Sequence, residues 1–231
     1  MKDDIKEKLT NQISIFCKDK KAVVGVSGGI DSAVVLGLCV EALGSENVIA
    51  AHMPYGKKKN TDAINLCAKY GVDTFMINIK PTVDSFKFAD SSYNKLSLGN
   101  IMARVRMTFL YAIANMENGL VMGTGNKSEL AIGYLTKYGD GGVDCETIGA
   151  LYKSDVYKTA RELKIPNSII DATPSADLWE GQTDENEMGF TYGELEGVLE
   201  GHIYSGEIYE NVQKAINNSS HKRNMPPIFH I

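Results

Sequence analysis

The chain has 231 residues, of which 43% are hydrophobic and 23% charged, as in ordinary globular proteins. It carries 24 lysines and arginines against 29 aspartates and glutamates, a formal net charge of −5, so we expect no nucleic-acid partner. The apolar run after Ser32 ends at Glu41, well short of the ~20 residues that span a bilayer, so we expect no membrane partner. The charged stretch MKDDIKEKL does not resemble a secretory signal.

The four cysteines lie far apart, at Cys17, Cys39, Cys67 and Cys145. They form no CxxC pair and have no histidine at metal-ligand spacing, so neither a disulfide framework nor a zinc site is indicated. None has the sequence setting of a catalytic nucleophile, and we expect buried thiols that pack as small hydrophobic groups. Reduced thiols of this kind favour a cytoplasmic protein.

Helix-like and strand-like segments alternate along the first half of the chain. Apolar spacing predicts helices over 5–17, 31–43, 60–70 and 98–117, and short apolar runs predict strands over 21–27, 47–53, 72–79 and 119–124. This order predicts an α/β fold in which helices flank a parallel sheet. Ligands bind beyond the C-terminal ends of such strands, so the loops that follow the four strands should line one crevice.

The second half is less regular. We expect a short helix and a mobile surface loop over 81–97, a helix over 153–164, and an acidic loop over 174–189 that contains the single tryptophan, Trp179. Thr191 and Glu194 have the spacing of a capping box and predict the start of a helix. Because no linker or internal repeat divides the sequence, we expect a single domain over 1–231.

A block of small residues, GVSGGIDS at 25–32, follows the first predicted strand. Glycines let backbone N–H groups approach an anion, the next helix adds its positive N-terminus, and Ser27 and Ser32 offer hydroxyl groups. Asp31 would repel phosphate unless a cation such as Mg²⁺ lay between them. The block lacks the lysine of a Walker A loop and the second glycine of a dinucleotide fingerprint. An ordinary glycine-rich turn, with Asp31 favouring the helix N-terminus, is the simpler alternative.

The SGGIDS block resembles the signature of the ATP-pyrophosphatase (PP-loop) superfamily, whose members cleave ATP between its α and β phosphates. A second block, GTGNKSE at 123–129 with KYGDGGVD at 137–144, is similar to the NAD synthetase family. Shorter similarities follow in the same order, at 100–106, 151–154, 181–185 and 221–222. The resemblance implies a Rossmann-like fold of the adenine nucleotide alpha hydrolase type with a PP-loop.

The resemblance also implies roles for the residues at matching positions. Asp31 and Glu129 would bind Mg²⁺, and Lys153 would act with them in catalysis by neutralising phosphate charge. ATP would contact Gly25, Val26, Ser27, Gly28, Gly29, Ile30, Asp31, Ser32, Thr124, Lys153 and Ser175. The substrate deamido-NAD would contact Arg104, Lys137, Asp144, His221 and Lys222.

Several of these residues have simpler structural explanations. Glu129 follows Asn126 by three residues, which is the spacing of a capping box. Lys153 could be a solvated residue at the start of a helix, where a cation gains nothing from the helix dipole. Arg104 fits a solvated helix face, and the residues 221–222 lie near a chain end, where fraying is common.

The implied reaction is the ATP-dependent amidation of deamido-NAD by ammonia through an adenylated intermediate, giving NAD, AMP and pyrophosphate. Mg²⁺ would be the cofactor and ATP a co-substrate. The nucleotide-binding part begins near residue 21, so we expect no glutaminase domain, and ammonia would be free or come from a separate protein. The family also implies a homodimer with the dinucleotide site near its interface. The alternatives are another PP-loop amidotransferase or tRNA thiolase, or a non-catalytic ATP-binding module of the same superfold.

Overall fold

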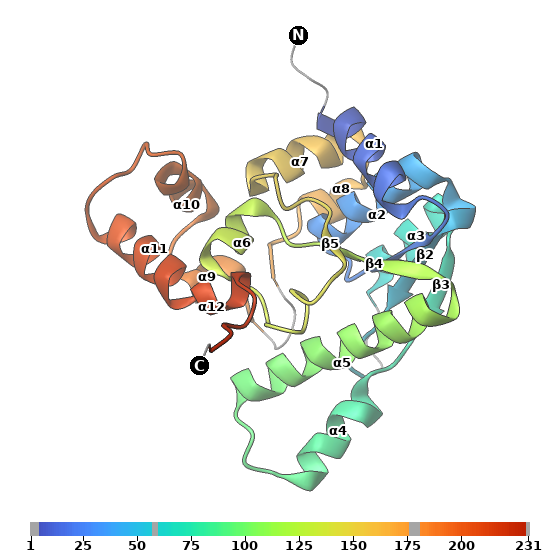
Figure 1. Cartoon of the computed structure of the whole chain (residues 1–231), viewed down its shortest axis with the longest axis horizontal. Helices are drawn as coiled ribbons and strands as arrows, with labels where there is room; N and C mark the ends of the chain where they lie inside the picture. The colour runs from blue at the N-terminus through green and yellow to red at the C-terminus, as the bar shows by residue number, and fades with distance from the viewer. Residues whose placement is uncertain (1–4, 57–59, 176–180, 230–231) are drawn as a thin grey trace.

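The computed structural model describes residues 5–56, 60–175 and 181–229, and its strands form one parallel sheet (Figure 1). The strands lie in the order β3-β2-β1-β4-β5. Their bounds are Lys21–Gly25 (β1), Val48–His52 (β2), Asp73–Met76 (β3), Gly119–Gly123 (β4) and Cys145–Glu146 (β5). The four predicted strands are confirmed, each shorter than expected. The two-residue β5 was not predicted, because it is a strand only through its pairing with β4.

Helices connect and cover these strands. Their bounds are Ile5–Cys17 (α1), Ile30–Leu43 (α2), Thr61–Tyr70 (α3), Lys80–Ala89 (α4), Lys95–Met116 (α5), Lys127–Ile132 (α6), Lys153–Glu162 (α7), Asn167–Ile170 (α8), Asp184–Met188 (α9), Tyr192–Leu199 (α10), Glu207–Asn218 (α11) and Ser220–Arg223 (α12), with a 3₁₀ turn at Ser45–Asn47 (η1). None of these described helices is both long and apolar enough to cross a membrane.

Two expectations about loops were wrong. The long helix α5 begins three residues earlier than predicted, because the Asn94 side chain accepts a hydrogen bond from Ser97 N at 2.8 Å and caps it. The predicted loop 174–189 contains helix α9, which Thr183 caps by accepting a hydrogen bond from Asn186 N. The start of each of these two helices depends on one polar capping residue among other polar residues, so the cap was not recognised in the sequence. Trp179 lies outside the described residues.

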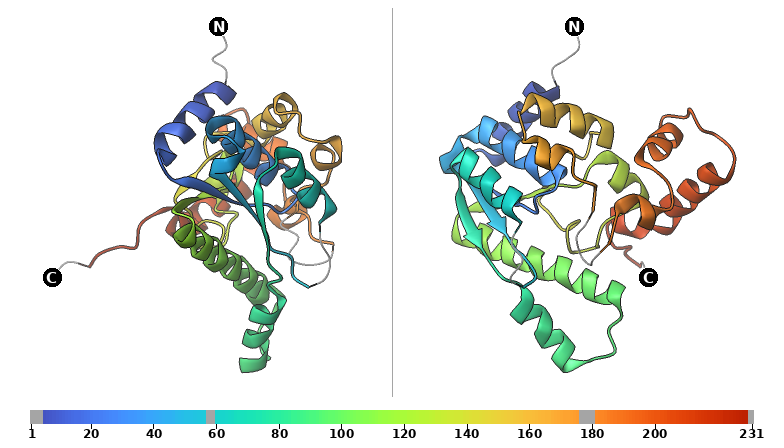
Figure 2. Two further views of the ribbon diagram at one scale, coloured as in Figure 1. Left: turned by 90° about the vertical axis from the view of Figure 1, so that its right-hand side faces the viewer. Right: turned by 180° about the vertical axis from the view of Figure 1, so that it is seen from behind.

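Helices cover both faces of the sheet (Figure 2). Alternate side chains of the strands pack against these helices on opposite faces. Val23, Ile49 and Val121 face α4 and α5, whereas the neighbouring residues of these strands pack with α1, α2, α3, α7 and α8. Three of the cysteines are buried and Cys145 is half-buried, and all four are free thiols. The expectation that they pack as small hydrophobic groups is confirmed for the three buried ones.

A smaller apolar cluster joins α6, α10 and α11 beside the sheet, where the red and orange helices lie in Figure 1. Leu195 and Val198 of α10 meet Val212 of α11 and Ile132 of α6. The regular apolar spacing of α11 was available in the sequence as a helix signal. This cluster fixes α10 against α6, and therefore next to the loop that follows β4.

The strand order creates a switch point between β1 and β4. From β1 the chain adds β2 and β3 on one side of the sheet, and then returns to add β4 and β5 on the other side. The loops after β1 and β4 therefore leave from neighbouring positions at the carboxyl edge of two paired strands. Val24 of β1 pairs with Met122 of β4, one residue before each strand ends. The two sequence blocks that follow Gly25 and Gly123 therefore meet in space.

Candidate active site

The first of these loops turns sharply between β1 and α2. Ser27 Oγ lies 3.1 Å from Ser32 Oγ and accepts a hydrogen bond from Gly29 N at 3.1 Å, so the turn is closed by its own hydroxyl groups. Gly28 has φ = +97°, and a side chain there would collide with the Asn60 amide. Only glycine suits this position, both for its backbone angle and for the space available.

The loop presents the N-terminus of α2 to the crevice. Gly29 is the N-cap, and no described side chain caps the helix there, so its first N–H groups stay available for an anion. His52 braces the loop from β2: its Nε2 accepts from Asn60 N at 3.2 Å, so its Nδ1 carries the proton and donates to Val26 O at 2.9 Å. This geometry is suited to phosphate.

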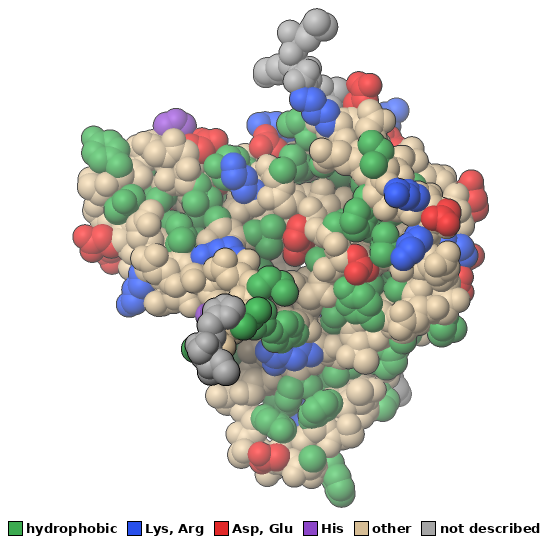
Figure 3. All heavy atoms as spheres, viewed as in Figure 1, with side chains coloured by type: hydrophobic (Ala, Val, Ile, Leu, Met, Phe, Trp, Pro, Cys, Tyr) green, Lys and Arg blue, Asp and Glu red, His purple; other side chains and the backbone are tan. Residues whose placement is uncertain are grey.

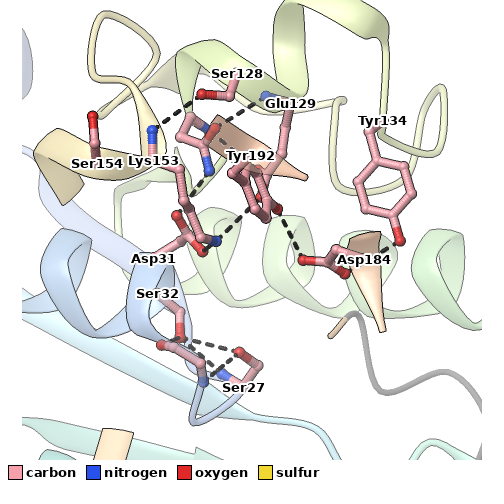
Figure 4. Close-up of polar contacts among 12 residues, drawn as sticks. Ser27, Asp31, Ser32, Ser128, Glu129, Tyr134, Lys153, Ser154, Asp184 and Tyr192 are labelled. Carbon is pink, nitrogen blue, oxygen red and sulfur yellow. Dashed lines mark hydrogen bonds and ion pairs between the residues drawn. The ribbon is translucent and has the colours of Figure 1, made fainter. Parts of the chain in front are cut away.

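Asp31, Lys153 and Glu129 meet beside the loop, as Figure 4 shows. Lys153 Nζ lies 2.6 Å from Asp31 Oδ2 and 3.5 Å from Glu129 Oε1. Its side chain is only 3% exposed. The solvated-lysine alternative is therefore wrong, and α2, α6 and α7 bring one charged residue each to a common point.

Glu129 forms the capping box and also reaches this point. Its Oε2 accepts from Asn126 N at 3.3 Å, and its backbone N donates to Asn126 Oδ1 at 3.0 Å, as the structural alternative requires. Its Oε1 meanwhile faces Lys153. The amide of Asn126 donates to Asp31 Oδ1 at 3.0 Å, so the cap also orients the second carboxylate. The two explanations of Glu129 are compatible.

The charges at this point are unbalanced. Burial, followed by the nearby Asp31 carboxylate, raises the pKa of Glu129 from its ordinary value to about 8. Burial alone would lower the pKa of Lys153, but the Asp31 and Glu129 carboxylates outweigh it and raise that pKa. Both shifts have one cause, because two carboxylates share the single positive charge of Lys153 in a buried place.

Helix α10 contributes two side chains, Tyr192 and Glu196, that contact the residues around Asp31, Lys153 and Glu129. The Tyr192 hydroxyl lies 2.9 Å from both Glu129 Oε1 and Asp184 Oδ2, and its ring centre is 4.8 Å from Lys153 Nζ. One turn later, Glu196 Oε1 accepts from Ser128 Oγ and from Ser154 N, beside the start of α7. Neither Tyr192 nor Glu196 was predicted. The only sequence signal was their i, i+4 spacing directly after the Thr191 capping box.

Four of the five residues expected to bind the dinucleotide also lie together. Arg104 is exposed on α5, and its Nε donates to Lys137 O at 3.2 Å. Lys137 Nζ donates to His221 O at 2.6 Å, and Lys222 Nζ donates to two backbone carbonyls after α6 at 2.7 Å each. The residues 221–222 are thus not frayed: they lie in α12 and are tied to the loop beside α5.

Asp144 lies apart from those four. Its Oδ2 accepts from Val121 N at 2.7 Å, and its Oδ1 accepts from the Tyr111 hydroxyl at 3.3 Å. Tyr111 and Arg104 both line a surface pocket of about 590 Å³. The other lining residues come from α5 and the loop after α6: Met107, Thr108, Ala112, Asn115, Tyr138 and Gly142.

The remaining two expected ATP contacts differ in their exposure. Thr124 follows β4 and is half-buried at the crevice, and Ser175 is exposed at the end of the described segment 60–175. Within the described residues, no group of three or more histidine, cysteine, aspartate or glutamate side chains is arranged to hold a metal. Among the described residues, Asp31 and Glu129 are the two carboxylates that contact Lys153 at this site.

Comparisons with known proteins agree with this geometry. A sequence model of the family described as NAD synthase matches residues 2–226. The NH(3)-dependent NAD(+) synthetase of Archaeoglobus fulgidus is 46% identical over 214 residues, which are 89% of this chain and 87% of the relative.

Two solved structures are similar over nearly their whole length. The NMN synthetase from Francisella tularensis superimposes with a TM-score of 0.92 and 36% identity, over 98% of this chain and 97% of that one. The NH3-dependent NAD synthetase from Campylobacter jejuni, in complex with nitrate, has a TM-score of 0.84 and 32% identity over the same shares. These matches confirm the predicted Rossmann-like fold with a PP-loop, and they favour an enzyme over a non-catalytic ATP-binding module. The chain belongs to the NAD synthase family, whose members are ligases that form a carbon–nitrogen bond.

Proposed function

We propose that the chain amidates deamido-NAD with ammonia at the expense of ATP, producing NAD, AMP and pyrophosphate. The observation that carries the proposal is the meeting of Asp31, Lys153 and Glu129 beside the phosphate loop, in a chain of the NAD synthase family. A buried cluster of this kind can neutralise phosphate charge as it develops.

ATP would lie over the loop after β1. The hydroxyls of Ser27 and Ser32 and the N–H groups at the start of α2, from Ile30 onward, would face its phosphates, and Gly25, Val26, Gly28 and Gly29 would line the turn beneath them. The N–H of Val26 already donates to Ala51 O, and that of Gly29 to Ser27 Oγ. Thr124, directly after β4, and Ser175 would meet the nucleotide from the two sides of the crevice, while Lys153 would approach its phosphates. Lys153 must then exchange part of its contact with Asp31 for phosphate oxygen, which its flexible side chain allows.

The residues present fit a Mg²⁺ ion. The two carboxylates of Asp31 and Glu129 converge on the same position, with Lys153 Nζ 2.6 Å from the first and 3.5 Å from the second. Mg²⁺ prefers hard oxygen ligands and usually keeps one or two protein carboxylates, with phosphate and water in the other positions. Bound there, it would offset the charge of the leaving pyrophosphate.

The dinucleotide would occupy the pocket along α5. Arg104 lines this pocket and donates to Lys137 O, and Lys137 in turn donates to His221 O, next to Lys222. The three positive charges would suit a pyrophosphate-bridged anion. Asp144 and His221 would complete the site. Lys137 and Lys222 now donate to backbone carbonyls, so they are positioned but can turn toward a ligand.

The reaction has two steps. A nicotinate carboxylate oxygen attacks the α-phosphorus of ATP, the bond to the β-phosphate oxygen breaks, and pyrophosphate leaves with its electron pair beside Lys153. Ammonia then adds to the activated carbonyl carbon, and the C–O bond breaks with release of AMP and a proton. The protein orients the reactants and holds a positive charge at the leaving phosphates.

The mononucleotide is a second candidate substrate. The Francisella tularensis protein with a TM-score of 0.92 is named an NMN synthetase. The same two steps on nicotinic acid mononucleotide would give NMN. The choice depends on contacts to the adenylate half, which only the dinucleotide has.

Several further properties are part of the proposal. We propose a cytoplasmic homodimer of single-domain chains that takes free ammonia or receives it from a separate protein. Support for the dimer comes from the arm formed by α4 and α5 (residues 80–116), where Figure 3 shows hydrophobic side chains on the surface. Phe88 and Leu96 in this arm are 94% and 63% exposed. Exposed apolar groups of this size are typical of interaction surfaces.

The test is an assay of purified protein with ATP and Mg²⁺, with either deamido-NAD or the mononucleotide, in the presence and absence of ammonium. We expect NAD to form only with ammonium, in equal amount to AMP and pyrophosphate, and deamido-NAD to be used with higher kcat/KM. Higher kcat/KM for the mononucleotide would replace the substrate assignment. Absence of AMP with both substrates, from protein that binds ATP, would refute the ligase proposal.

A further inference from the structure

We infer that Tyr192 is a positioning residue that fixes the metal-binding carboxylate of Glu129 and connects it to α9. The inference rests on the proposed Mg²⁺ site of Asp31 and Glu129. Tyr192 is 8% exposed and lies outside the phosphate loop, the Lys153 helix and every sequence block that pointed to ATP.

The position of Tyr192 is itself tightly determined. It begins α10 directly after Thr191, whose side chain accepts from Glu194 N at 3.2 Å, while Glu194 Oε2 accepts from Thr191 N at 2.8 Å. The backbone N of Tyr192 donates to Glu185 Oε1 at 3.0 Å. A side chain that starts from so fixed a backbone can hold its hydroxyl at one place, as a supporting residue must.

The Tyr192 hydroxyl lies between two carboxyl groups, 2.9 Å from Glu129 Oε1 and 2.9 Å from Asp184 Oδ2. It has one proton to donate, and its oxygen can accept a second hydrogen bond. A Glu129 carboxylate that binds a cation can only accept, so it would receive the proton of Tyr192.

The contact chain continues beyond Asp184. The Tyr134 hydroxyl lies 3.2 Å from Asp184 Oδ1 and 2.6 Å from Glu187 Oε2, and Asp184 N donates to Pro174 O at 3.1 Å. Figure 4 shows Tyr134, Asp184, Tyr192 and Glu129 in sequence. Tyr192 is thus the link between the carboxylate pair and the segment that flanks Ser175.

The variant Tyr192→Phe tests this role because it removes only the hydroxyl and keeps the ring over Lys153. Binding of α,β-methylene-ATP, which cannot be cleaved between these phosphates, is measured by calorimetry with Mn²⁺ and with EDTA. The Mn²⁺ gain is the ratio of the affinity for this ATP analogue with Mn²⁺ to its affinity in EDTA. We expect Tyr192→Phe to lower this gain by about 10- to 100-fold, the usual effect of losing a group that supports a metal ligand. Affinity in EDTA should match the wild type.

Tyr134→Phe is the matched control. It removes a tyrosine hydroxyl from the same acidic cluster without a contact to Glu129, and we expect its Mn²⁺ gain to stay within about twofold of the wild type. Asp184→Asn is a second informative variant, since its amide can donate to the Tyr192 oxygen and leaves the Tyr192 hydroxyl able to donate to Glu129. It too should keep the Mn²⁺ gain.

The outcomes separate the two proposals. A Tyr192→Phe protein with wild-type Mn²⁺ gain overturns the inference and leaves the proposed function intact, as does an equal loss of affinity with Mn²⁺ and with EDTA. A wild-type protein whose affinity does not rise with Mn²⁺ refutes the metal site and the inference together, whatever the result of the NAD assay. In steady-state kinetics, Tyr192→Phe should raise the half-saturating Mg²⁺ concentration and leave the KM of deamido-NAD unchanged.

Discussion

The two ends of the crevice are built differently. At the phosphate loop, Lys153 is 3% exposed and its charge is paired with two carboxylates, so the polar groups are already oriented before any ligand binds. Along α5, the charged groups of Arg104, Lys137 and Lys222 donate to backbone carbonyls, and Arg104 is exposed. We propose that the first region serves the chemical step and the second serves recognition of the dinucleotide. Changes in the first should therefore affect kcat, and changes in the second should affect KM.

The largest effect should come from Lys153→Met, which keeps the length of the side chain and removes its charge. Loss of one preorganised group that stabilises developing charge typically lowers kcat by about 10²- to 10³-fold. We expect a loss of that size in NAD formation, measured with saturating substrates. The control is Lys158→Met on the same helix, since Lys158 is 67% exposed and pairs with Asp155 on the surface. Equal losses in the two variants would contradict the role of Lys153.

Gly28→Ala should come next, because it distorts the phosphate loop itself. The new side chain would sit at φ = +97° and collide with Asn60, and the backbone angle alone costs about 1–2 kcal/mol. We expect ATP affinity to fall by about tenfold, measured by calorimetry. Gly71→Ala is the matched control: it has φ = +64° with open space around it, far from the loop. It should lose stability and keep ATP affinity. If Gly28→Ala bound ATP normally, the loop would not be the ATP site.

Arg104→Gln tests the region along α5. A charge-assisted hydrogen bond contributes about 1.5–3 kcal/mol, so we expect the KM of deamido-NAD to rise at least tenfold with little change in the KM of ATP. Arg161→Gln, which removes an exposed arginine that also donates to a backbone carbonyl, should change neither constant. A fall in kcat alone for Arg104→Gln would mean that the α5 pocket is not a recognition site.

The smallest effect concerns Glu146, at the end of β5. Burial raises the pKa of this carboxyl from its ordinary value to about 7, while a hydrogen bond from Gly125 N partly opposes the rise. Because the folded pKa lies above the unfolded one, the contribution of Glu146 to stability is complete below about pH 4.5 and is lost as the pH rises through 7.

Glu146→Gln should therefore lose less stability than the wild type between pH 5 and pH 8. Its amide oxygen can still accept from Gly125 N, so the change removes the titrating proton and keeps the contact. Urea denaturation at the two pH values measures the difference. The same decrease in both proteins would show that Glu146 titrates normally in the folded state.

Local patterns were sufficient to predict the part of the fold that carries the phosphate loop. The signals for this part are short and continuous in sequence: the apolar runs near 21–27 and 119–124 and the glycines at 25–29. Because the strands were predicted to be parallel, the loops after the first and fourth strands were expected at the same edge of the sheet. Strand β5 was missed because it exists only through its pairing with β4. The start of α9 was missed although its cap, Thr183, is local, because the cap stands in a polar stretch without apolar spacing.

The candidate site likewise contains residues that local sequence patterns identified and residues that they did not. Asp31, Glu129 and Lys153 were named from sequence blocks, whereas the burial of Lys153 depends on packing between α2, α6 and α7 that no local pattern specifies. Tyr192 and Glu196 were missed because α10 reaches the site through an apolar cluster with α6 and α11. Residues such as these reach the site because of how distant helices pack, so no local sequence motif identifies them.

The most direct test of the account follows oxygen atoms through the reaction. Deamido-NAD labelled with ¹⁸O at both nicotinate carboxylate oxygens is converted with ATP, Mg²⁺ and ammonium, and the products are analysed by mass spectrometry. If the carboxylate attacks the α-phosphorus beside Lys153, each AMP should carry one ¹⁸O and each NAD should retain the other. Unlabelled AMP would show that water, and not the substrate carboxylate, attacks ATP, and would contradict the proposed adenylation.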